Sequence, residues 1–472
     1  MAYLRTYSKA LDFEIEYLSI GTFRNDEAKD FVVLHDNAAN ISRWAAISVY
    51  EDMFTNFLTC EIAVMDQDNF LLNRLRTDET ILLKFKTPDL GSKSFEERTH
   101  YFYLYKIDKV MIEQKPQAAA FIIKGISFEY FYSSLRTFSK AYKGKTNEIV
   151  SDIYKEYILQ KNSTYVGDRR SRTVNKQLFF GRPTKHDMKF TFPYVNPMDA
   201  INHLASVSID SVNPDICNYI FFENKDGFHF TSITELIENP KRIHNYSTKI
   251  PMDVPFTFFD YYFDKTIVVR PKRTGDKIID TLDGVYGEFF AEYDLLYKSY
   301  TPFVNNSFQS KNTYGKRYLD YFPKTKHLNK YPLLSKENLV FKNPLGRNRV
   351  CFTNDALYSE EVDVSRTQKE WKLFSTHEGE YSFQRRSMMQ QINAFSIEVM
   401  VPGNSNITVG DCVDLNTFVY KTEDKDKYLS GRYLVTGVNH LITLSNYVCM
   451  LTLSRDSITS VEFDDDTSAN EG

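Results

Sequence analysis

The most strongly patterned stretch reads AFSIEVMVPGNSNITVGDCVDL at residues 394–415, and it continues with RYLVTGVNHLI at 432–442 and YVCMLTLS at 447–454. Apolar residues alternate with others along these segments, and Phe395, Ile397 and Val399 share one face. Residues two apart lie on the same side of a strand, so the alternation predicts half-buried antiparallel strands. Four strands in about 65 residues, separated by short turns, predict a small sandwich or barrel.

The first 130 residues contain a second set of strand patterns, at Leu58–Val64, Thr80–Lys86, His100–Glu113 and Ala118–Ile126. Within this set, Tyr105–Ile126 echoes Tyr433–Ser454. Both segments are equally long, and both read as a long strand, a tight polar turn and an apolar strand. The echo predicts that one chain carries two copies of one barrel. The alternative is that any two long hairpins look alike.

Between the two strand sets the pattern changes to an α+β segment. Thr146 is a candidate N-cap for a helix that runs to Ile158, and Asn196 with Pro197 begins a second helix. A hairpin follows at Tyr219–Glu223 and Phe228–Thr231, and Thr266–Arg270 is one further strand candidate. Pro271–Gln384 is then interrupted repeatedly by glycine and proline. We interpret it as an insertion with its own small fold, or as a surface that becomes ordered in an assembly.

The predicted fold is mostly β, or α+β overall, with two similar antiparallel β-barrels, an intervening α+β domain and a large irregular insertion. The predicted divisions are a first barrel at 1–127, an α+β domain at 128–239, a second barrel at 240–270 and 386–460, an insertion at 271–385 and an acidic tail at 461–472.

Composition limits the classes of function. A formal net charge of −4 argues against a dedicated nucleic-acid binder. The basic clusters at Arg169, Arg170 and Arg172 and at Arg385-Arg386 are short, so we expect solvated charges or ion pairs. Met1–Ile20 lacks a signal-peptide pattern and no run approaches 18 apolar residues, so we expect neither a leader nor a membrane anchor. The five widely spaced cysteines suit a reducing compartment, in which Cys60, Cys412 and Cys449 are small buried apolar residues.

Catalytic signatures are incomplete throughout. Gly144-Lys145-Thr146 resembles the end of a phosphate-binding loop, but the first glycine of that motif is replaced by Ser139. His377-Glu378 begins like a zinc-protease helix, but Tyr381 stands where the second histidine belongs.

The remaining candidate groups, a histidine and two carboxylate clusters, have structural rather than catalytic interpretations. His440 is interpreted as a structural imidazole. The carboxylate clusters are interpreted as solvated loop charge, at Glu360, Glu361 and Asp363 and at Asp424 and Asp426. We therefore predict no catalytic residue, no cofactor, no metal site and no enzymatic activity.

Several segments resemble the central baseplate hub family of contractile-tail phages. VPGNSNITVGDCVDL with YLSGRYLVTGVNHLI and YVCMLTLSRDS resembles the second barrel of that family, and YEDMFTNFLTCEIAVMD with ETILLKFKTP resembles the first. FTFPYVNPMDAINHLASVSI is similar to its helical domain, and GVYGEFFAEYDLLYKSY is similar to the insertion of its longer members. The resemblance is poor from Asn305 to Arg386.

The resemblance implies a structural, homotrimeric hub located in the virion baseplate and assembled in the host cytoplasm. Three subunits with two barrels each would form a pseudo-sixfold ring, which meets a sixfold tail tube on one side and a threefold spike on the other. The implied partners are further copies of the chain, the tail tube protein and the central spike protein. Tape-measure and baseplate wedge proteins are further implied partners. No needle-like repeat follows Asp456, so the spike is expected to be a separate chain, and DNA is expected to pass through the lumen unread.

Two rival functions stay open on the sequence. One is a peripheral receptor- or carbohydrate-binding tail module, because aromatic-rich β proteins bind such ligands. The other is a cell-wall hydrolase of the tail tip, which needs two positioned carboxylates in a cleft.

Overall fold

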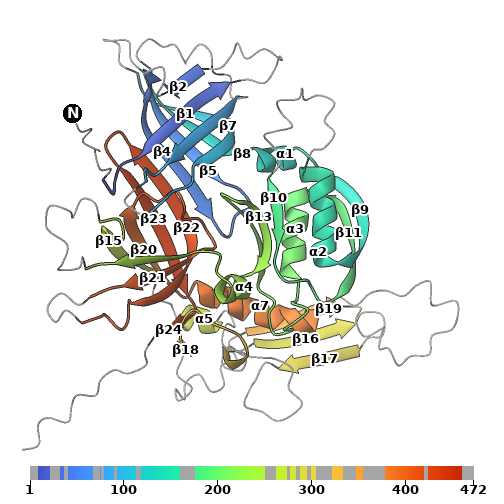
Figure 1. Ribbon diagram of the computed structural model, residues 1–472. Helices are drawn as coiled ribbons and strands as arrows, with labels where there is room; N and C mark the ends of the chain where they lie inside the picture. Colours follow the sequence, from blue (N-terminus) through green and yellow to red (C-terminus); the bar gives the residue numbers. More distant parts are fainter. Residues whose placement is uncertain are drawn as a thin grey trace, which may run out of the picture.

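A computed structural model describes most of the patterned segments of the chain. The described residues are 9–21, 32–36, 41–66, 75, 79–89, 93–112, 119–159, 176–249, 262–273, 277–282, 288–294, 299–304, 322–332, 347–353, 378–418 and 424–459. A long curled sheet occupies one side of the molecule, and an α+β domain lies beside it (Figure 1). The predicted mostly-β fold class is confirmed.

The first sheet module is built from strands in the first 127 residues. Its strands are β1 (Glu14–Gly21), β2 (Val32–Asp36), β3 (Ile41–Ser42), β4 (Trp44–Asp52), β5 (Thr59–Asp66), β6 (Thr80–Lys86), β7 (Arg98–Ile112) and β8 (Ala119–Ser127). They pair in the order β4-β5-β8-β7-β6-β1-β2-β3. The sequence patterns located β5 to β8 to within two residues and missed β1 to β4.

The second module contains the stretch that shows the strongest alternation. Its strands are β14 (Ile243–Ser247), β15 (Val268–Arg273), β20 (Phe395–Pro402), β21 (Cys412–Asn416), β22 (Gly431–Thr443) and β23 (Tyr447–Arg455). They pair as β15-β20-β23-β22-β21, and β14 adds to β21 in parallel.

The two modules share one pairing order. Strands β4-β5-β8-β7-β6 of the first occupy the same relative positions as β15-β20-β23-β22-β21 of the second. The predicted repeat of the long hairpin is therefore a repeat of five paired strands. The modules are not separate, because β4 pairs antiparallel with β22 and makes a single sheet of both.

The α+β domain follows the first module directly. Its elements are α1 (Phe128–Ser134), β9 (Phe138–Lys145), α2 (Thr146–Ile153), a π-helical turn (Tyr154–Ile158), β10 (Gln177–Phe180), β11 (Asp187–Val195), α3 (Pro197–Ser206), β12 (Tyr219–Asn224), β13 (Gly227–Ser232) and α4 (Ile233–Glu238). Helices α2 and α3 pack together on a core with the aromatic side chains of the flanking strands. The expected N-cap of the first helix was wrong by one residue, since Lys145 is the N-cap and Thr146 already has a helical backbone.

The insertion has a small sheet of its own among its described residues. The strands β17 (Ser299–Val304), β16 (Glu288–Asp294) and β19 (Arg347–Thr353) pair in that order. This favours the first of the two interpretations of the insertion, a fold of its own. Short elements α5 (Lys277–Leu282), η4 (Phe322–Lys324) and β18 (Tyr331–Pro332) also belong to this stretch, and β18 pairs with β24 (Ser457–Ile458). The domain boundaries given above stay a prediction.

Helix α7 (Glu378–Ile392) connects the insertion to β20 and was not predicted. Its Arg385 side chain donates hydrogen bonds to the carbonyl oxygens of Ala205, Cys217 and Tyr219, at 2.8 to 3.0 Å. Arg385 therefore holds α7 on the α+β domain, and the expectation of a solvated charge at this position was wrong. Arg169, Arg170 and Arg172 lie outside the described residues.

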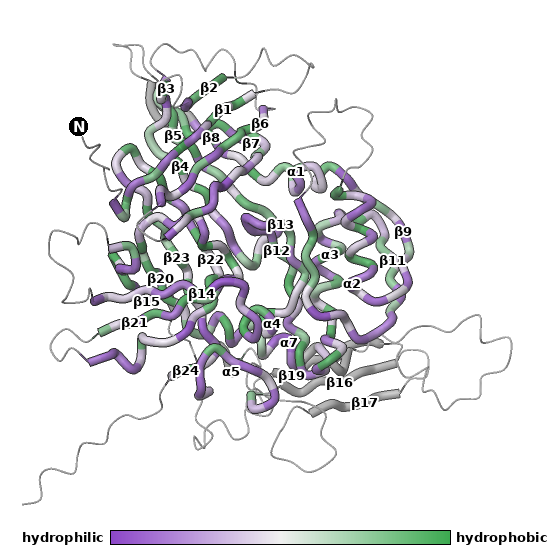
Figure 2. Tube along the Cα trace, viewed as in Figure 1, coloured by the Kyte–Doolittle hydropathy of each residue, from purple (hydrophilic) through white to green (hydrophobic). Residues whose placement is uncertain are grey.

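One apolar core runs through both modules. It joins residues of the first module, such as Leu83 and Ile123, to residues of the second, such as Val399 and Val438, all fully buried. Figure 2 shows apolar and polar residues alternating along these strands. Four of the five cysteines, including Cys60, Cys412 and Cys449, are buried free thiols, as predicted. Within the described part of the chain, no helix is long and apolar enough to cross a membrane.

Helix α3 starts as its sequence predicts, and this start can be tested. The Asn196 side chain accepts a hydrogen bond from the Met198 amide at 2.9 Å and donates to the Ser133 carbonyl at 2.8 Å. We expect Asn196→Ala to lower the free energy of unfolding by about 1–2 kcal/mol, measured by urea denaturation. Ser206→Ala, at a half-buried position in the last turn of the same helix, is the control. Equal effects of the two substitutions would contradict this role for Asn196.

Candidate functional site

The segment that resembles a phosphate-binding loop, Gly144-Lys145-Thr146, is the end of a strand followed by the start of a helix. Gly144, the second-to-last residue of β9, has a positive φ of 141°, and α2 begins two residues later. The Thr146 hydroxyl is buried and lies 2.6 Å from the Ser208 hydroxyl. The segment caps a helix within the α+β domain and presents no glycine cradle for a phosphate.

The carboxylates that the sequence groups together serve loops where they are described. Asp424 is exposed, and Asp426 accepts hydrogen bonds from the amides of Tyr428 and Leu429, which form a turn. Glu360, Glu361, Asp363 and His377 lie outside the described residues. Within the ranges described above, no group of three or more His, Cys, Asp or Glu side chains could hold a metal ion.

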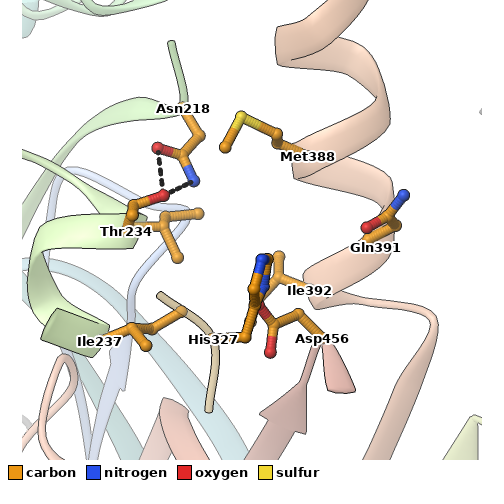
Figure 3. A pocket seen from close by; sticks show the side chains of 9 residues that line it. Asn218, Thr234, Ile237, His327, Met388, Gln391, Ile392 and Asp456 are labelled. Atoms are coloured by element: carbon orange, nitrogen blue, oxygen red, sulfur yellow. Dashed lines mark hydrogen bonds and ion pairs between the residues drawn. The ribbon is translucent and has the colours of Figure 1, made fainter. Parts of the chain in front are cut away.

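A small pocket lies between α4, α7 and the segment around His327 (Figure 3). His327 Nδ1 lies 2.6 Å from Asp456 Oδ2, and the other ring nitrogen lies 3.0 Å from the Phe322 carbonyl oxygen. Across the pocket, Asn218 and Thr234 hydrogen-bond to each other. Protein atoms therefore contact both ring nitrogens of His327, and no lining side chain is a free nucleophile. The pocket is a place where three segments meet: α4, α7 and the segment around His327.

His440 is fully buried in the second module, as its structural interpretation requires. Its Nδ1 lies 2.8 Å from the Tyr447 hydroxyl, and the Phe85 ring of the first module lies beside it with a 5.9 Å centroid separation. Burial holds the pKa of His440 well below its ordinary value, and the charge of Arg98 acts in the same direction. The imidazole is therefore neutral, and it packs where the two modules meet.

The meeting place of the two modules is a continuous antiparallel ladder between β4 and β22. It pairs seven residues on each strand, from Asp52 with Gly437 to Ala46 with Thr443. The Ser48 hydroxyl donates across it to the Asn439 side chain at 2.7 Å. Backbone hydrogen bonds thus fix the register of one module on the other.

A buried ion pair fastens a loop of the second module to this ladder. We call residues 403–411 the junction loop. Arg98 on β7 pairs with Glu51 on β4, and the two side chains are 1% and 0% exposed. Arg98 also donates to the carbonyl oxygens of Ser405 and Ile407, while Glu51 accepts from the Val409 amide at 3.2 Å. Both charges are therefore compensated by partners from the two modules.

The junction loop has two further attachments. The Thr87 hydroxyl donates to the Gly403 carbonyl at 3.1 Å and accepts from the Ser405 amide at 2.9 Å. On the other side, the Asn224 side chain of the α+β domain donates to the Val409 carbonyl at 3.2 Å. The loop therefore contacts the first module, the second module and the α+β domain together, and it fixes their mutual orientation.

Gly403 allows the junction loop to pass close to a buried ring. A Cβ atom at this position would lie 2.1 Å from the Tyr447 ring, which is fully buried. We expect Gly403→Ala to lower the free energy of unfolding by about 1–3 kcal/mol through overpacking, measured by urea denaturation. Gly437→Ala, where the nearest atom is 3.3 Å away, should cost less. An unchanged free energy of unfolding in Gly403→Ala would contradict this close approach of the loop to the Tyr447 ring.

A second buried charge cluster lies in the α+β domain. Lys176 Nζ is 3.3 Å from Glu129 Oε2 and also pairs with Glu223, and the two carboxylates are 2% and 0% exposed. One cation thus serves two acids. Burial raises the pKa of Glu223 to about 7, and Glu129 adds to the rise while Lys176 opposes it.

This cluster predicts a pH dependence. The pKa of Glu223 is raised in the folded state above its ordinary value of 4.5, so between these values the folded protein binds more protons than the unfolded chain. The contribution of protonated Glu223 to the free energy of unfolding is fully present below pH 4.5 and is lost as the pH rises through 7. As the pH rises from 5 to 8, the free energy of unfolding of Glu223→Gln should therefore increase relative to that of the wild type by on the order of 2 kcal/mol. Urea midpoints across this range, with exposed Glu61→Gln as control, check it; a constant difference between Glu223→Gln and wild type would contradict it.

The residues that matter at the junction were missed by the sequence analysis. Glu51 and Arg98 stand among alternating strand residues, where a charged side chain on the inner face is unusual. Glu51 follows Ile47 and Val49 at spacing two, which was the available signal. The sequence did not show that Glu51 and Arg98 pair with each other, because 47 positions separate them.

No family model matches this chain. It is 35% identical over 78 residues to a protein described as "Probable baseplate hub protein gp334" from Vibrio phage KVP40. The match covers 16% of this chain and 18% of the relative, so less than a fifth of either protein is aligned. The resemblance to baseplate hub proteins that the sequence indicated is confirmed by this match.

Solved structures of tail proteins are also similar at very low identity. A tail protein from Neisseria meningitidis MC58 is 8% identical with a TM-score of 0.48, covering 94% of this chain and 97% of the other. The 43 kDa tail protein of prophage MuSo2 from Shewanella oneidensis is 8% identical with a TM-score of 0.46, covering 94% and 100%.

Proposed function

We propose that this chain is a structural hub of a phage tail baseplate, acting as a homotrimer of pseudo-sixfold symmetry between the tail tube and the central spike. The proposal places it in the virion, assembled in the host cytoplasm, with no enzymatic activity. DNA passes through the lumen of the ring without being read.

One observation carries the proposal: the chain contains two sheet modules with the same strand order, joined edge to edge. Three chains of this kind present six similar modules around one axis. A threefold object can then contact a sixfold tube with near-equivalent surfaces. The match to a probable hub protein supports the same assignment.

The geometry of the junction supports a mechanical role. The two modules share one core and one buried ion pair, so they form a rigid unit that can transmit force. At the junction, the buried side chains of Arg98, Glu51 and Thr87 are engaged in an ion pair and hydrogen bonds of the fold.

The test is the mass and shape of the purified assembly. We expect native mass spectrometry to give three times the 55.2 kDa mass of one chain, alone or after co-expression with the tube and spike proteins of the same virus. Negative-stain class averages should show a ring of six lobes. A protein that stays monomeric in all these mixtures would contradict the proposal.

The two rival functions give different results in the same preparation. A hydrolase produces a clearing zone in a zymogram of bacterial cell wall, and we expect none. A peripheral receptor-binding module lies off the tail axis in micrographs of virions labelled with antibody to this chain. We expect the label on the axis, at the junction of tube and spike.

A further inference from the structure

We propose that Arg455 is a binding site for a carboxylate group, and that the acidic segment Glu462–Asp466 of this chain supplies that carboxylate. The inference goes beyond the proposed function and does not depend on a trimer. It starts from a buried cation that has no acid paired with it among the described residues.

Arg455 ends β23, and its side chain is fully buried. The guanidinium donates a hydrogen bond from Nη2 to the Tyr428 carbonyl oxygen at 2.7 Å. Neither Nε nor Nη1 has a hydrogen-bond partner in the part of the chain that the structure describes. A buried charge needs such partners, because they offset the hydration that it has lost. Two donor nitrogens of Arg455 are therefore available to a ligand.

Three aromatic rings surround this cation. The guanidinium carbon lies 4.0 Å from the ring centre of Phe395, 5.2 Å from that of Tyr433 and 5.4 Å from that of Tyr428. Ring faces attract the positive charge, but they leave the N–H donors in the guanidinium plane unused. A planar carboxylate matches those donors in both geometry and charge. The surroundings of Arg455 thus favour an acid over a neutral ligand.

Two acids lie near Arg455, and both are engaged elsewhere. Asp456 follows it in the chain, and that carboxylate lies 2.6 Å from the His327 ring. Asp426 belongs to the turn that covers the guanidinium, and it accepts hydrogen bonds from two amides of that turn. The buried cation of the junction, in contrast, has its own carboxylate. The acid that fits Arg455 must therefore come from outside the described residues.

The chain itself brings an acidic segment to this place. Thr459, the last described residue, donates its hydroxyl to the Lys427 carbonyl oxygen at 3.0 Å. The next carbonyl of that turn, on Tyr428, accepts from Arg455. The segment Glu462–Asp466 begins three residues after Thr459. Three to seven extended residues span roughly 10–25 Å, which is farther than the separation of two groups bound to neighbouring carbonyls.

Tyr428 is the wall of the site that can move. Its side chain is 54% exposed, whereas Phe395 and Tyr433 are buried. Its ring meets the Phe395 ring edge-on at a centroid separation of 5.3 Å. Exposed side chains change rotamer quickly, and such a rotation breaks no backbone hydrogen bond. Turning this ring outward opens the guanidinium to a carboxylate while the other two rings stay in place.

A labelled peptide tests the site on the full-length chain. The receptor carries Glu462→Gln, Asp464→Asn, Asp465→Asn and Asp466→Asn, so its own segment no longer competes; we call it the neutralised receptor. The probe is a fluorescein-labelled peptide of residues 460–469, and fluorescence anisotropy gives its Kd. Replacing the acids of the peptide by Gln and Asn should weaken binding about tenfold or more, because charge-assisted hydrogen bonds are lost. This comparison leaves the folded receptor unchanged.

Further substitutions in the neutralised receptor assign the binding to Arg455. Arg455→Met should abolish it. Arg455→Lys keeps a cation but loses the planar fork, so it should weaken binding about tenfold, and it carries the comparison if Arg455→Met does not fold. Arg432→Met is the matched control and should bind like its parent, because Arg432 lies on the same module, is 36% exposed and is paired with Asp414. Circular dichroism verifies that each variant is folded.

The wild type decides which acid occupies the site. Its own segment competes at an effective concentration of about a millimolar, so the wild type should bind the peptide about tenfold more weakly than the neutralised receptor. Equal binding by the two would overturn occupancy by the chain's own segment. Binding that is absent, or that does not change with Arg455→Lys or with the acids of the peptide, would overturn the site itself. Neither result touches the proposed function, which the mass of the assembly tests separately.

Discussion

Arg98→Met is expected to destabilise the protein more than any other single substitution considered, by about 3–5 kcal/mol. The change leaves the Glu51 carboxylate, which is 0% exposed, without its cation. It also removes the donors to the Ser405 and Ile407 carbonyl oxygens. The junction loop then loses its main hold on the first module. The measurement is the urea midpoint followed by tryptophan fluorescence and by circular dichroism.

The control for Arg98→Met is Lys86→Met on the neighbouring strand β6. Lys86 lies 3.0 Å from Glu14, but the two side chains are 40% and 48% exposed. Exposed pairs of this kind contribute about 0–1 kcal/mol. Adding Glu51→Gln to Arg98→Met should recover part of the loss, because the uncompensated charge is gone. If the double variant is no more stable than Arg98→Met, the uncompensated charge of Glu51 does not explain the loss of stability.

Lys176→Met is expected to have the second largest effect, also about 3–5 kcal/mol at pH 8. Lys176 is the cation beside two acids, Glu129 and Glu223, whose side chains are 2% and 0% exposed. Without it, both acids are buried with like charges close together. The loss should shrink at pH 5, because a carboxylate whose pKa is raised by burial takes up a proton there.

Lys140→Met is the matched control in the same domain. Lys140 pairs with Glu156 at 2.5 Å, with both side chains more than 40% exposed, so its removal should cost little at either pH. Urea midpoints at pH 5 and pH 8 for the two variants give the comparison. A loss at Lys176 that is the same at both pH values would show that packing, rather than the two acids, explains it.

Alternation of apolar residues predicted the strands of both modules where one face is buried and one is not. It located β5 to β8 and β20 to β23, because period two is a local property of the chain. It missed β1, whose pairing with β6 shifts register between Ile15 and Tyr17, and α7, whose apolar residues do not form one stripe. These segments take their structure from neighbours that are distant in sequence.

The α+β domain shows the same limit at single residues. The Asn196 cap was predicted because capping depends on neighbours within three positions. The role of Arg385 was not predicted, since its acceptors lie 166 to 180 positions away. A short run of basic residues gives no sign of whether it will be solvated or will hold a helix in place.

The amino-acid sequence was sufficient to predict a mostly β protein, because periodicity is a property of adjacent residues, and the equal lengths of two segments raised the repeat of one hairpin as one of two interpretations. The three-dimensional structure was needed to show that the two modules share one sheet through β4 and β22 and that Glu51 and Arg98 connect them. The physical reason is that backbone hydrogen bonds between strands do not depend on side-chain identity. A strand's pattern therefore shows which face is buried, but not which strand will lie beside it.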